Sequence, residues 1–206
     1  MDTKYLGEDT DVRIGAGNTF FEYTTVHRAS GEGNTTVIGD DNFIMAYVHI
    51  AHNCRIGDGC VVTNGVQLAG YTEVGSHANI GGLAGIHQFC RVGTLAMVGA
   101  CSYVSKDIPP YMLAAGNPCR VRGINSVGLQ RAGVTATALA LLRRAHRLIY
   151  RAGLNLTQAL SAIEADLLPQ SVPGRGQEQL QELVRFMRSS SRGIELRSGR
   201  QGEKEP

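Results

Sequence analysis

Histidine is the side chain best suited to proton transfer near neutral pH, and five of the six histidines lie in the first half of the chain. They are His27, His49, His52, His77 and His87. An imidazole held in a cleft can act as a general base near neutral pH. Whether this chemistry is possible depends on whether the fold brings several of these rings together.

The elements that must position these histidines follow a repeat of six residues. Every sixth residue from Ile38 to Val104 is aliphatic, namely Ile38, Ile44, Ile50, Ile56, Val62, Leu68, Val74, Ile80, Ile86, Val92, Val98 and Val104. An α-helix would need a period of 3.6 and an ordinary strand a period of 2. A period of six indicates a β-solenoid with three faces per turn and one inward aliphatic residue on each face.

Counting along the eighteen-residue turns predicts where the histidines lie. His27 and His87 occupy the same position in their turns, and His52 occupies the next one. Because stacked turns lie about 4.8 Å apart, these three residues are predicted to line one edge of the solenoid. His49 comes three residues before His52 and is expected to point to the opposite side. His77 lies on another face, and we expect no role for it.

The repeat extends back from Ile38 to Ile14, but with six extra residues. Ile14 and Ile38 are 24 residues apart instead of 18, and the polar, Gly-rich stretch 28–36 lies between them. This stretch is predicted to be an excursion loop, and loops on a rigid repeat often carry function. Pro109 and Pro110 are expected to end the ladder because each lacks a backbone donor. The predicted solenoid therefore spans residues 1–108, and a linking segment spans 109–134.

The remainder of the chain has helical periodicity. Helices are predicted over 135–152, 156–168 and 177–192, with Thr135 as a cap and Gly153 and Gly193 as terminators. His146 lies on the apolar face of the first helix, where a structural role is expected. The helical domain is thus predicted over 135–193, and the polar residues 194–206 are predicted to be a disordered tail.

The amino-acid composition argues against a membrane protein and a secreted one. The chain has no apolar run of about eighteen residues, so no membrane span is expected, and its N-terminus does not resemble a secretory signal. Five cysteines without a CxxC pair predict reduced thiols.

Charge is distributed unevenly along the chain. Residues 1–119 carry 6 Lys and Arg against 11 Asp and Glu, and residues 120–206 carry 14 against 7. A basic C-terminal part without a nucleic-acid motif favours a small acidic protein as partner.

Two other classes remain as alternatives at this point. In trimeric β-helix carbonic anhydrases three imidazoles bind zinc, which makes a zinc hydratase one alternative. No spacing in this chain makes three ring nitrogens converge, so no metal is predicted. A purely structural or binding solenoid is the other alternative, although a scaffold would not need a row of histidines.

The local strings around the histidines resemble the UDP-N-acetylglucosamine O-acyltransferase family of lipid A biosynthesis. The strings are His49–Cys54, Leu68–Tyr71, Gly81–Phe89 and Asp107–Tyr111, and the resemblance runs from Asp2 to Gly193. It implies a mainly β fold, a left-handed parallel β-helix of hexapeptide repeats followed by a small α-helical C-terminal domain. It also implies a cytoplasmic homotrimer with active sites between subunits. The implied reaction moves a 3-hydroxyacyl group from acyl carrier protein, which is acidic, to the 3-hydroxyl of UDP-N-acetylglucosamine, with no cofactor.

The resemblance also implies roles for individual residues. His52 would be the general base, and the Gly70 amide would donate to the developing oxyanion. The residues implied to bind substrate, including His27 from the turn count, are Asp2, Lys4, His27, His49, His87, Gln88, Asn125 and Arg131. Ala100 falls at a position that helps to set the length of the acyl chain.

Several departures from the family pattern bear on these roles. Asn53 follows the expected base where the family has Asp, Tyr71 stands where a second His is expected, and Ala132 replaces an Arg. The family also carries further coils before the stretch that begins here at Asp2. These departures leave three alternatives open: a 3-amino sugar as acceptor, an acetyl-CoA-dependent hexapeptide transferase, and an inactive, truncated trimeric β-helix.

Overall fold

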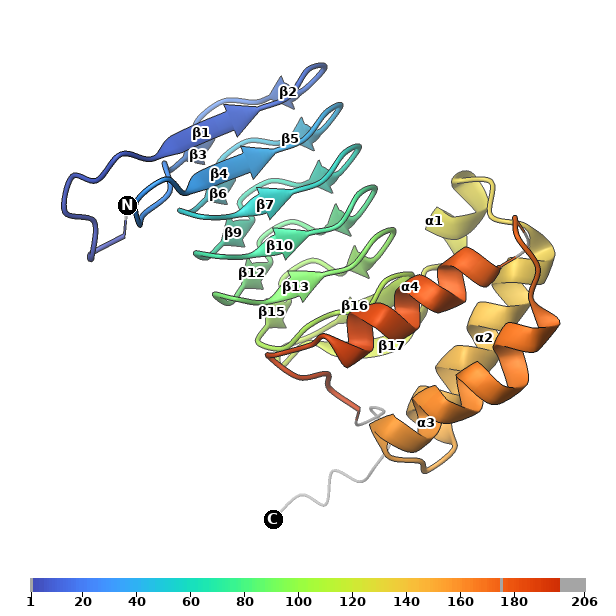
Figure 1. Ribbon diagram of the computed structural model, residues 1–206. Coiled ribbons are helices and arrows are strands. Elements are labelled where there is room, and N and C mark those ends of the chain that lie inside the picture. The colour runs from blue at the N-terminus through green and yellow to red at the C-terminus, as the bar shows by residue number, and fades with distance from the viewer. Residues whose placement is uncertain (1, 175, 197–206) are drawn as a thin grey trace, which may run out of the picture.

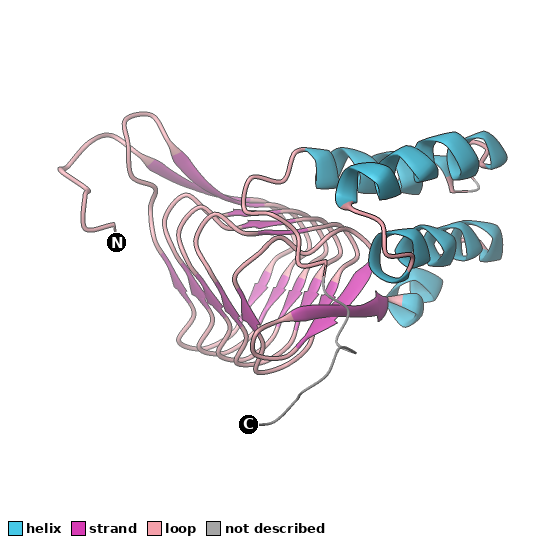
Figure 2. Ribbon diagram, turned by 90° about the horizontal axis from the view of Figure 1, so that it is seen from below, coloured by secondary structure: helices cyan, strands magenta, loops and turns pink. Residues whose placement is uncertain are grey.

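The computed structural model describes residues 2–174 and 176–196 as a parallel β-helix with helices beside its C-terminal end (Figure 1). Seen along the stack, the coils superimpose in a three-sided outline, and the helices lie at one side of it (Figure 2). Parallel sheets form the three faces. The predicted fold class, a β-helix followed by a small helical domain, is confirmed.

Each of the first five coils contributes one strand to each of the three sheets, and the second sheet is extended by β16 and the antiparallel β17. The first sheet contains β1 (Asp11–Ile14), β4 (Thr35–Ile38), β7 (Arg55–Ile56), β10 (Glu73–Val74) and β13 (Arg91–Val92). The second contains β2 (Thr19–Phe20), β5 (Phe43–Ile44), β8 (Val61–Val62), β11 (Asn79–Ile80), β14 (Met97–Val98), β16 (Met112–Ala115) and β17 (Arg120–Ile124). The third contains β3 (Thr25–Val26), β6 (His49–Ile50), β9 (Gln67–Leu68), β12 (Gly85–Ile86) and β15 (Tyr103–Val104).

The aliphatic ladder forms the core of the β-helix. Ile44, Leu68 and Ile80 are fully buried, and the other ladder positions are nearly so. Burying each such side chain stabilises the fold by about 1.5–3 kcal/mol. Glycine follows the aliphatic residue where coils stack most closely: a Cβ on Gly75 would lie 2.5 Å from the amide nitrogen of Thr94. The repeated aliphatic–Gly pair is therefore a packing requirement of the stack.

The cysteines are free, as predicted. Cys54, Cys60, Cys90 and Cys119 are buried, and Cys101 is exposed. Burial raises the pKa of the Cys54 and Cys60 thiols to about 11, so these thiols remain protonated core residues at neutral pH.

The excursion loop is present where it was predicted. Ile14 pairs with Ile38 and Val26 with Ile50, each 24 residues apart, so the extra residues fall after Val26. The N-terminal residues 2–10 form no strand, which corrects the predicted start of the solenoid at residue 1. They pack on the loop instead: the Gly31 amide donates to the Glu8 carboxylate at 2.7 Å.

The prediction that Pro109 and Pro110 end the ladder is wrong. Ile108 bridges to Val92 and Ala114 pairs with Val98, each 16 residues apart, so a shortened coil continues past the prolines. The prolines are tolerated because they lie at the corner between the first and the second sheet. The predicted link 109–134 therefore contains part of this coil, the antiparallel strand β17 and the first helix.

Four α-helices follow. They are α1 (Ser126–Arg131), α2 (Ala136–Arg151), α3 (Leu156–Ala162), which continues as a π-helical turn Ile163–Leu167 and a 3-10 turn Leu168–Gln170, and α4 (Gln177–Arg188). The Thr135 side chain caps α2 as predicted, and His146 is buried among the apolar side chains. Within the described residues no helix has the length and apolarity to cross a membrane.

Helix α4 ends at Arg188, not at the predicted residue 192, because the chain then returns to the β-helix. The Asp107 carboxylate accepts from the Arg91 amide at 2.8 Å and from the Ser190 hydroxyl at 2.8 Å. The Asp107 amide donates to the Gly193 carbonyl at 3.0 Å. We call residues 189–196 the return segment.

The predicted disordered tail therefore begins too early. Its first residue, Ile194, forms a β-bridge with Asp107 and is buried, because the return segment pairs with the last coil. The predicted tail residues 197–206 lie outside the described residues.

Candidate active site

The predicted histidine cleft exists as a pocket on the third sheet. Its volume is about 470 Å³, and it extends to the corner that joins the third sheet to the first. The lining includes His27, His49, His52, His87 and Gly70. The structure thus brings together five of the residues that the sequence singled out.

The strand register explains this gathering. Val26 pairs with Ile50, Ile50 with Leu68, and Leu68 with Ile86, so the next residues in each strand also stack. His27 and His87 therefore share one column, with two alanines between them, and His52 lies one residue further on, at the corner. The prediction that His49 points away from His52 is wrong. The left-handed residue Asn53 (φ 60°) belongs to a corner between the two sheets, so both rings face outward into the pocket.

The His52 imidazole is oriented by the amide of Asn53. The Nδ1 atom of His52 lies 2.9 Å from Asn53 Oδ1. Asn53 cannot turn its nitrogen toward the ring, because its Nδ2 donates to the Ser30 carbonyl and its Oδ1 accepts from the Ser30 amide, each at 3.0 Å. Oδ1 therefore accepts the Nδ1 proton, which leaves Nε2 as the unprotonated nitrogen that a general base needs.

Gly70 lies directly against this ring. A Cβ at Gly70 would lie 2.5 Å from both Cε1 and Nε2 of His52. Among the described residues the Gly70 amide has no hydrogen-bond acceptor. A free N–H group and an unprotonated imidazole nitrogen at one place are the two groups that acyl transfer requires, one for the oxyanion and one for the proton.

His27 and His49 form a perpendicular pair with ring centroids 4.7 Å apart. The Nδ1 atom of His49 also lies 2.8 Å from the Thr25 hydroxyl. Burial lowers the pKa of both rings, and each is lowered further by the charge of a neighbouring histidine, His27 acting on His49 and His52 on His27. Both rings are therefore neutral at pH 7 and offer hydrogen-bonding groups to a substrate.

His87 is in contact with the return segment. Its Nδ1 atom lies 3.3 Å from a guanidinium nitrogen of Arg192, which also donates to the Ser105 carbonyl at 3.1 Å. The same Nδ1 atom lies 3.1 Å from the backbone carbonyl of Gln88. The Gln88 side chain itself is exposed and does not line the pocket. No sequence pattern pointed to Arg192.

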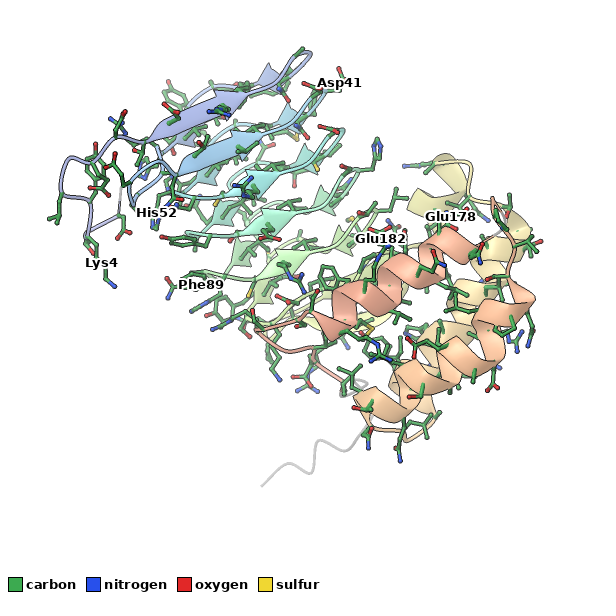
Figure 3. The ribbon with its side chains drawn as sticks, in the orientation of Figure 1. Lys4, Asp41, His52, Phe89, Glu178 and Glu182 are labelled. Carbon is green, nitrogen blue, oxygen red and sulfur yellow. The ribbon has the colours of Figure 1, made fainter. Side chains whose placement is uncertain are left out.

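Asp2 and Lys4 lie beside the same corner. Figure 3 shows Lys4 and His52 at the same edge of the β-helix, with Lys4 extending into solvent. The Asp2 carboxylate lies 3.8 Å from Nδ1 of His52 and accepts from the Ser30 hydroxyl at 2.7 Å. Ser30 was not singled out individually, although it belongs to the excursion loop that was flagged as a functional candidate.

Besides Gln88, Asp2 and Lys4, three more of the predicted residues do not line the pocket. Ala100 is exposed at the corner between the second and third sheets. Asn125 caps α1, and its side chain donates to the Leu95 carbonyl at 2.9 Å. Arg131 is exposed at the end of α1. Within one chain these residues are separate from the histidines.

Tyr71, which belongs to the next coil, packs against the His52 ring. Its ring lies perpendicular to His52 with a centroid separation of 5.4 Å, and it stacks on Phe89 at 4.8 Å. An aromatic contact of this kind restricts the motion of the imidazole. The described residues contain no group of three His, Cys, Asp or Glu side chains placed to hold a metal ion.

Comparison with known proteins identifies the family. Residues 107–195 match the family described as UDP N-acetylglucosamine O-acyltransferase, domain 2, and residues 35–70 match the bacterial transferase hexapeptide family. The acyl-[acyl-carrier-protein]–UDP-N-acetylglucosamine O-acyltransferase of Burkholderia orbicola is 43% identical over 195 residues, which are 94% of this chain and 73% of that protein. The protein of the same name from Gloeothece citriformis is 46% identical over 80% of this chain and 60% of its own length.

Solved structures agree with these relatives. LpxA from Acinetobacter baumannii superimposes with a TM-score of 0.87 at 40% identity, covering 94% of this chain and 73% of that one. The UDP-N-acetylglucosamine acyltransferase of Arabidopsis gives a TM-score of 0.87 at 37% identity, covering 94% and 68%. The chain therefore belongs to the UDP-N-acetylglucosamine O-acyltransferase family.

Proposed function

We propose that this chain transfers a 3-hydroxyacyl group from acyl carrier protein to the 3-hydroxyl group of UDP-N-acetylglucosamine, the first step of lipid A biosynthesis. The relatives named for this reaction support the substrates. The observation that carries the mechanism is the oriented His52 ring against the free amide of Gly70.

In the proposed transfer, each step uses a group at the pocket. Nε2 of His52 takes the proton of the sugar 3-hydroxyl as its oxygen attacks the thioester carbonyl carbon. The carbonyl oxygen becomes negative and accepts a hydrogen bond from the Gly70 amide. The C–S bond then breaks, the thiol of the carrier leaves with the proton, and the sugar ester remains. His27, His49 and His87 line the rest of the pocket, and Asp2 and Lys4 lie at its edge as sugar–nucleotide ligands.

Transfer assays test this proposal directly. The purified chain is incubated with hydroxyacyl carrier proteins of several chain lengths and labelled UDP-N-acetylglucosamine, and in parallel with its 3-amino analogue and with acetyl-CoA. We expect product from the hydroxyacyl carriers and the 3-hydroxyl sugar. Product only with the amino sugar or only with acetyl-CoA would replace the proposed substrates. No product from a well-folded oligomer would indicate the inactive β-helix.

Replacement of Gly70 tests the proposed geometry. In Gly70→Ala the new methyl group requires the His52 ring to move, and a displaced base lowers the rate by about 100-fold. Gly123→Ala is the control, because a Cβ at Gly123 meets no atom within 4 Å. Initial rates at saturating substrate are the measurement. A Gly70→Ala rate equal to that of the control would show that the ring and the amide do not act together.

The basic face of α2 fits the acidic carrier protein. Arg143, Arg147 and Arg151 are exposed at intervals of four residues, and none forms an ion pair within the described residues. An unpaired cationic stripe attracts an acidic partner and speeds its association. We place the carrier on this face.

A charge reversal tests this docking face. We expect Arg147→Glu to raise the KM for the acyl carrier about tenfold, with kcat little changed and the salt dependence weakened. Arg13→Glu, an exposed arginine at the other end of the β-helix, serves as control. An equal effect of both variants would mean that only the net charge matters.

A homotrimer and a cytoplasmic location complete the proposal. Asn125 and Arg131 do not line the pocket of their own chain, which suits residues that contact the substrate of a neighbouring subunit. Sedimentation equilibrium of the purified chain is expected to give three times the mass of one chain, and a monomer with full activity would contradict sites between subunits.

A further inference from the structure

We infer that Asp2 is a positioning residue for His52. Its carboxylate, linked through the Ser30 hydroxyl, supplies the negative charge on the Nδ1 side of the imidazole that the neutral Asn53 does not provide. It thereby stabilises the imidazolium that forms when His52 takes the substrate proton. The inference rests on the proposed function, in which His52 is the base, and assigns Asp2 a role beyond holding the sugar–nucleotide.

The geometry places the carboxylate on the correct side of the ring. Oδ2 of Asp2 lies 3.8 Å from Nδ1 of His52, the nitrogen that faces away from the reacting groups. The Ser30 hydroxyl lies 2.7 Å from that carboxylate, 3.1 Å from Asn53 Oδ1 and 3.5 Å from Nδ1 of His52. The hydroxyl has a single proton, which it donates over the shortest of these distances to Asp2, while its oxygen lies close to the amide and the imidazole.

Asn53 performs only half of the task of an aspartate at this position. Its amide oxygen accepts the Nδ1 proton at 2.9 Å and so selects the tautomer. It carries no net charge, so it stabilises the protonated ring less than a carboxylate would. Asp2 supplies the missing charge from a greater distance.

The Asp2 carboxylate stays ionised where the enzyme works. The Lys4 amide donates to it at 3.0 Å, and this hydrogen bond and the one from Ser30 lower the pKa of the carboxyl group. Only 17% of each of the Asp2 and His52 side chains is exposed, so water screens the pair incompletely. Other titratable groups near the ring are Tyr71, the neutral His27, and Lys4 beside the carboxylate.

The excursion loop holds Asp2 in place. Glu8 and Asp9 of the N-terminal segment accept from the amides of Gly31 and Gly33 at 2.7 Å and 2.9 Å. Asn34 donates to the Ser30 carbonyl at 2.9 Å, which fixes the residue that contacts both Asp2 and Asn53. The six extra residues of the first coil thus have a definite use: they carry the serine that joins the N-terminal carboxylate to the catalytic ring.

A rescue experiment tests the inference. Asp2→Asn, Asn53→Asp and the double variant are compared with the parent. We expect Asp2→Asn to lower kcat by about 10- to 100-fold. Because the protonated ring loses its negative neighbour, the acidic limb of the pH–rate profile should move to lower pH. In the double variant the new carboxylate lies directly against Nδ1, so kcat and the acidic limb should return toward those of the parent.

The alternative outcome is equally specific. If Asp2 only binds the sugar, Asp2→Asn raises the KM for UDP-N-acetylglucosamine, the acidic limb stays in place and Asn53→Asp rescues nothing, which overturns the inference. A second readout needs no turnover. In the full chain without substrate, the ¹⁵N signals of the His52 ring should change at a lower pH in Asp2→Asn than in the parent. If they change at the same pH in both proteins, the inference is overturned. A parent that is inactive but shows this shift would refute the proposed reaction alone.

Discussion

His52→Ala is expected to lower kcat by about 10³-fold while leaving both KM values within a few fold. General base catalysis contributes roughly 10²–10⁴ to such reactions, and the remaining groups, the Gly70 amide and the pocket, still bind the substrates. The ring is partly exposed at the corner and belongs to no aliphatic core layer, so the thermal unfolding midpoint should change little.

The control for this variant is His77→Asn. His77 lies at a different corner with a φ of 60°, a conformation that Asn tolerates, and it does not line the pocket. We expect parent-like rates. The pH dependence distinguishes the candidate bases: the acidic limb should disappear in His52→Ala. If His52→Ala keeps both full activity and the acidic limb, another pocket histidine, His87 or His49, takes the proton.

Asp107→Ala is expected to lower the free energy of unfolding by about 3 kcal/mol. Asp107 is 1% exposed, and its carboxylate accepts from Arg91 and Ser190. Its removal leaves the partly buried Arg91 amide without an acceptor and the guanidinium without its counter-charge, and breaking a buried pair costs about 3–5 kcal/mol. The lower end applies because the Arg91 side chain is 21% exposed.

Urea unfolding followed by far-UV circular dichroism measures this loss. The matched control is Asp11→Ala, whose carboxylate is 62% exposed and 3.8 Å from the Arg13 guanidinium. We expect that variant to stay within about 0.5 kcal/mol of the parent. Equal effects at both positions would mean that the return segment adds nothing to stability beyond an ordinary surface charge.

The β-helix could be predicted because each coil repeats the same packing pattern, one inward aliphatic residue on each face. The inward residue recurs every six positions, and the same count predicts that His27, His52 and His87 lie at one edge. The error at Pro109 and Pro110 shows the limit of a local rule. A proline removes a backbone donor, but at a corner of this helix the donor is not required, and only the register of the coils shows this.

The parts of the site that could not be predicted depend on tertiary packing. Residues 2–10 have no periodicity, so nothing in their spacing indicated that Asp2 approaches His52 through Ser30. The same holds for Arg192, which reaches His87 from the far end of the chain. The helix prediction to residue 192 failed for a related reason: pairing with Asp107 outweighs the helical preference of the last residues.

The return segment has a consequence for the order in which the protein matures. A ribosome releases the coils one after another, and each new coil can stack on the previous one as it emerges. The final coil differs: Arg91 can pair with Asp107 early, but two further partners of Asp107 arrive only with Ser190 and Gly193. The Asp107 carboxylate lacks the Ser190 hydroxyl, and the Asp107 amide lacks the Gly193 carbonyl, until the helical domain has been synthesised. The same delay applies to the contact between Arg192 and His87, so a histidine that lines the pocket gains this neighbour only after the helical domain has been synthesised.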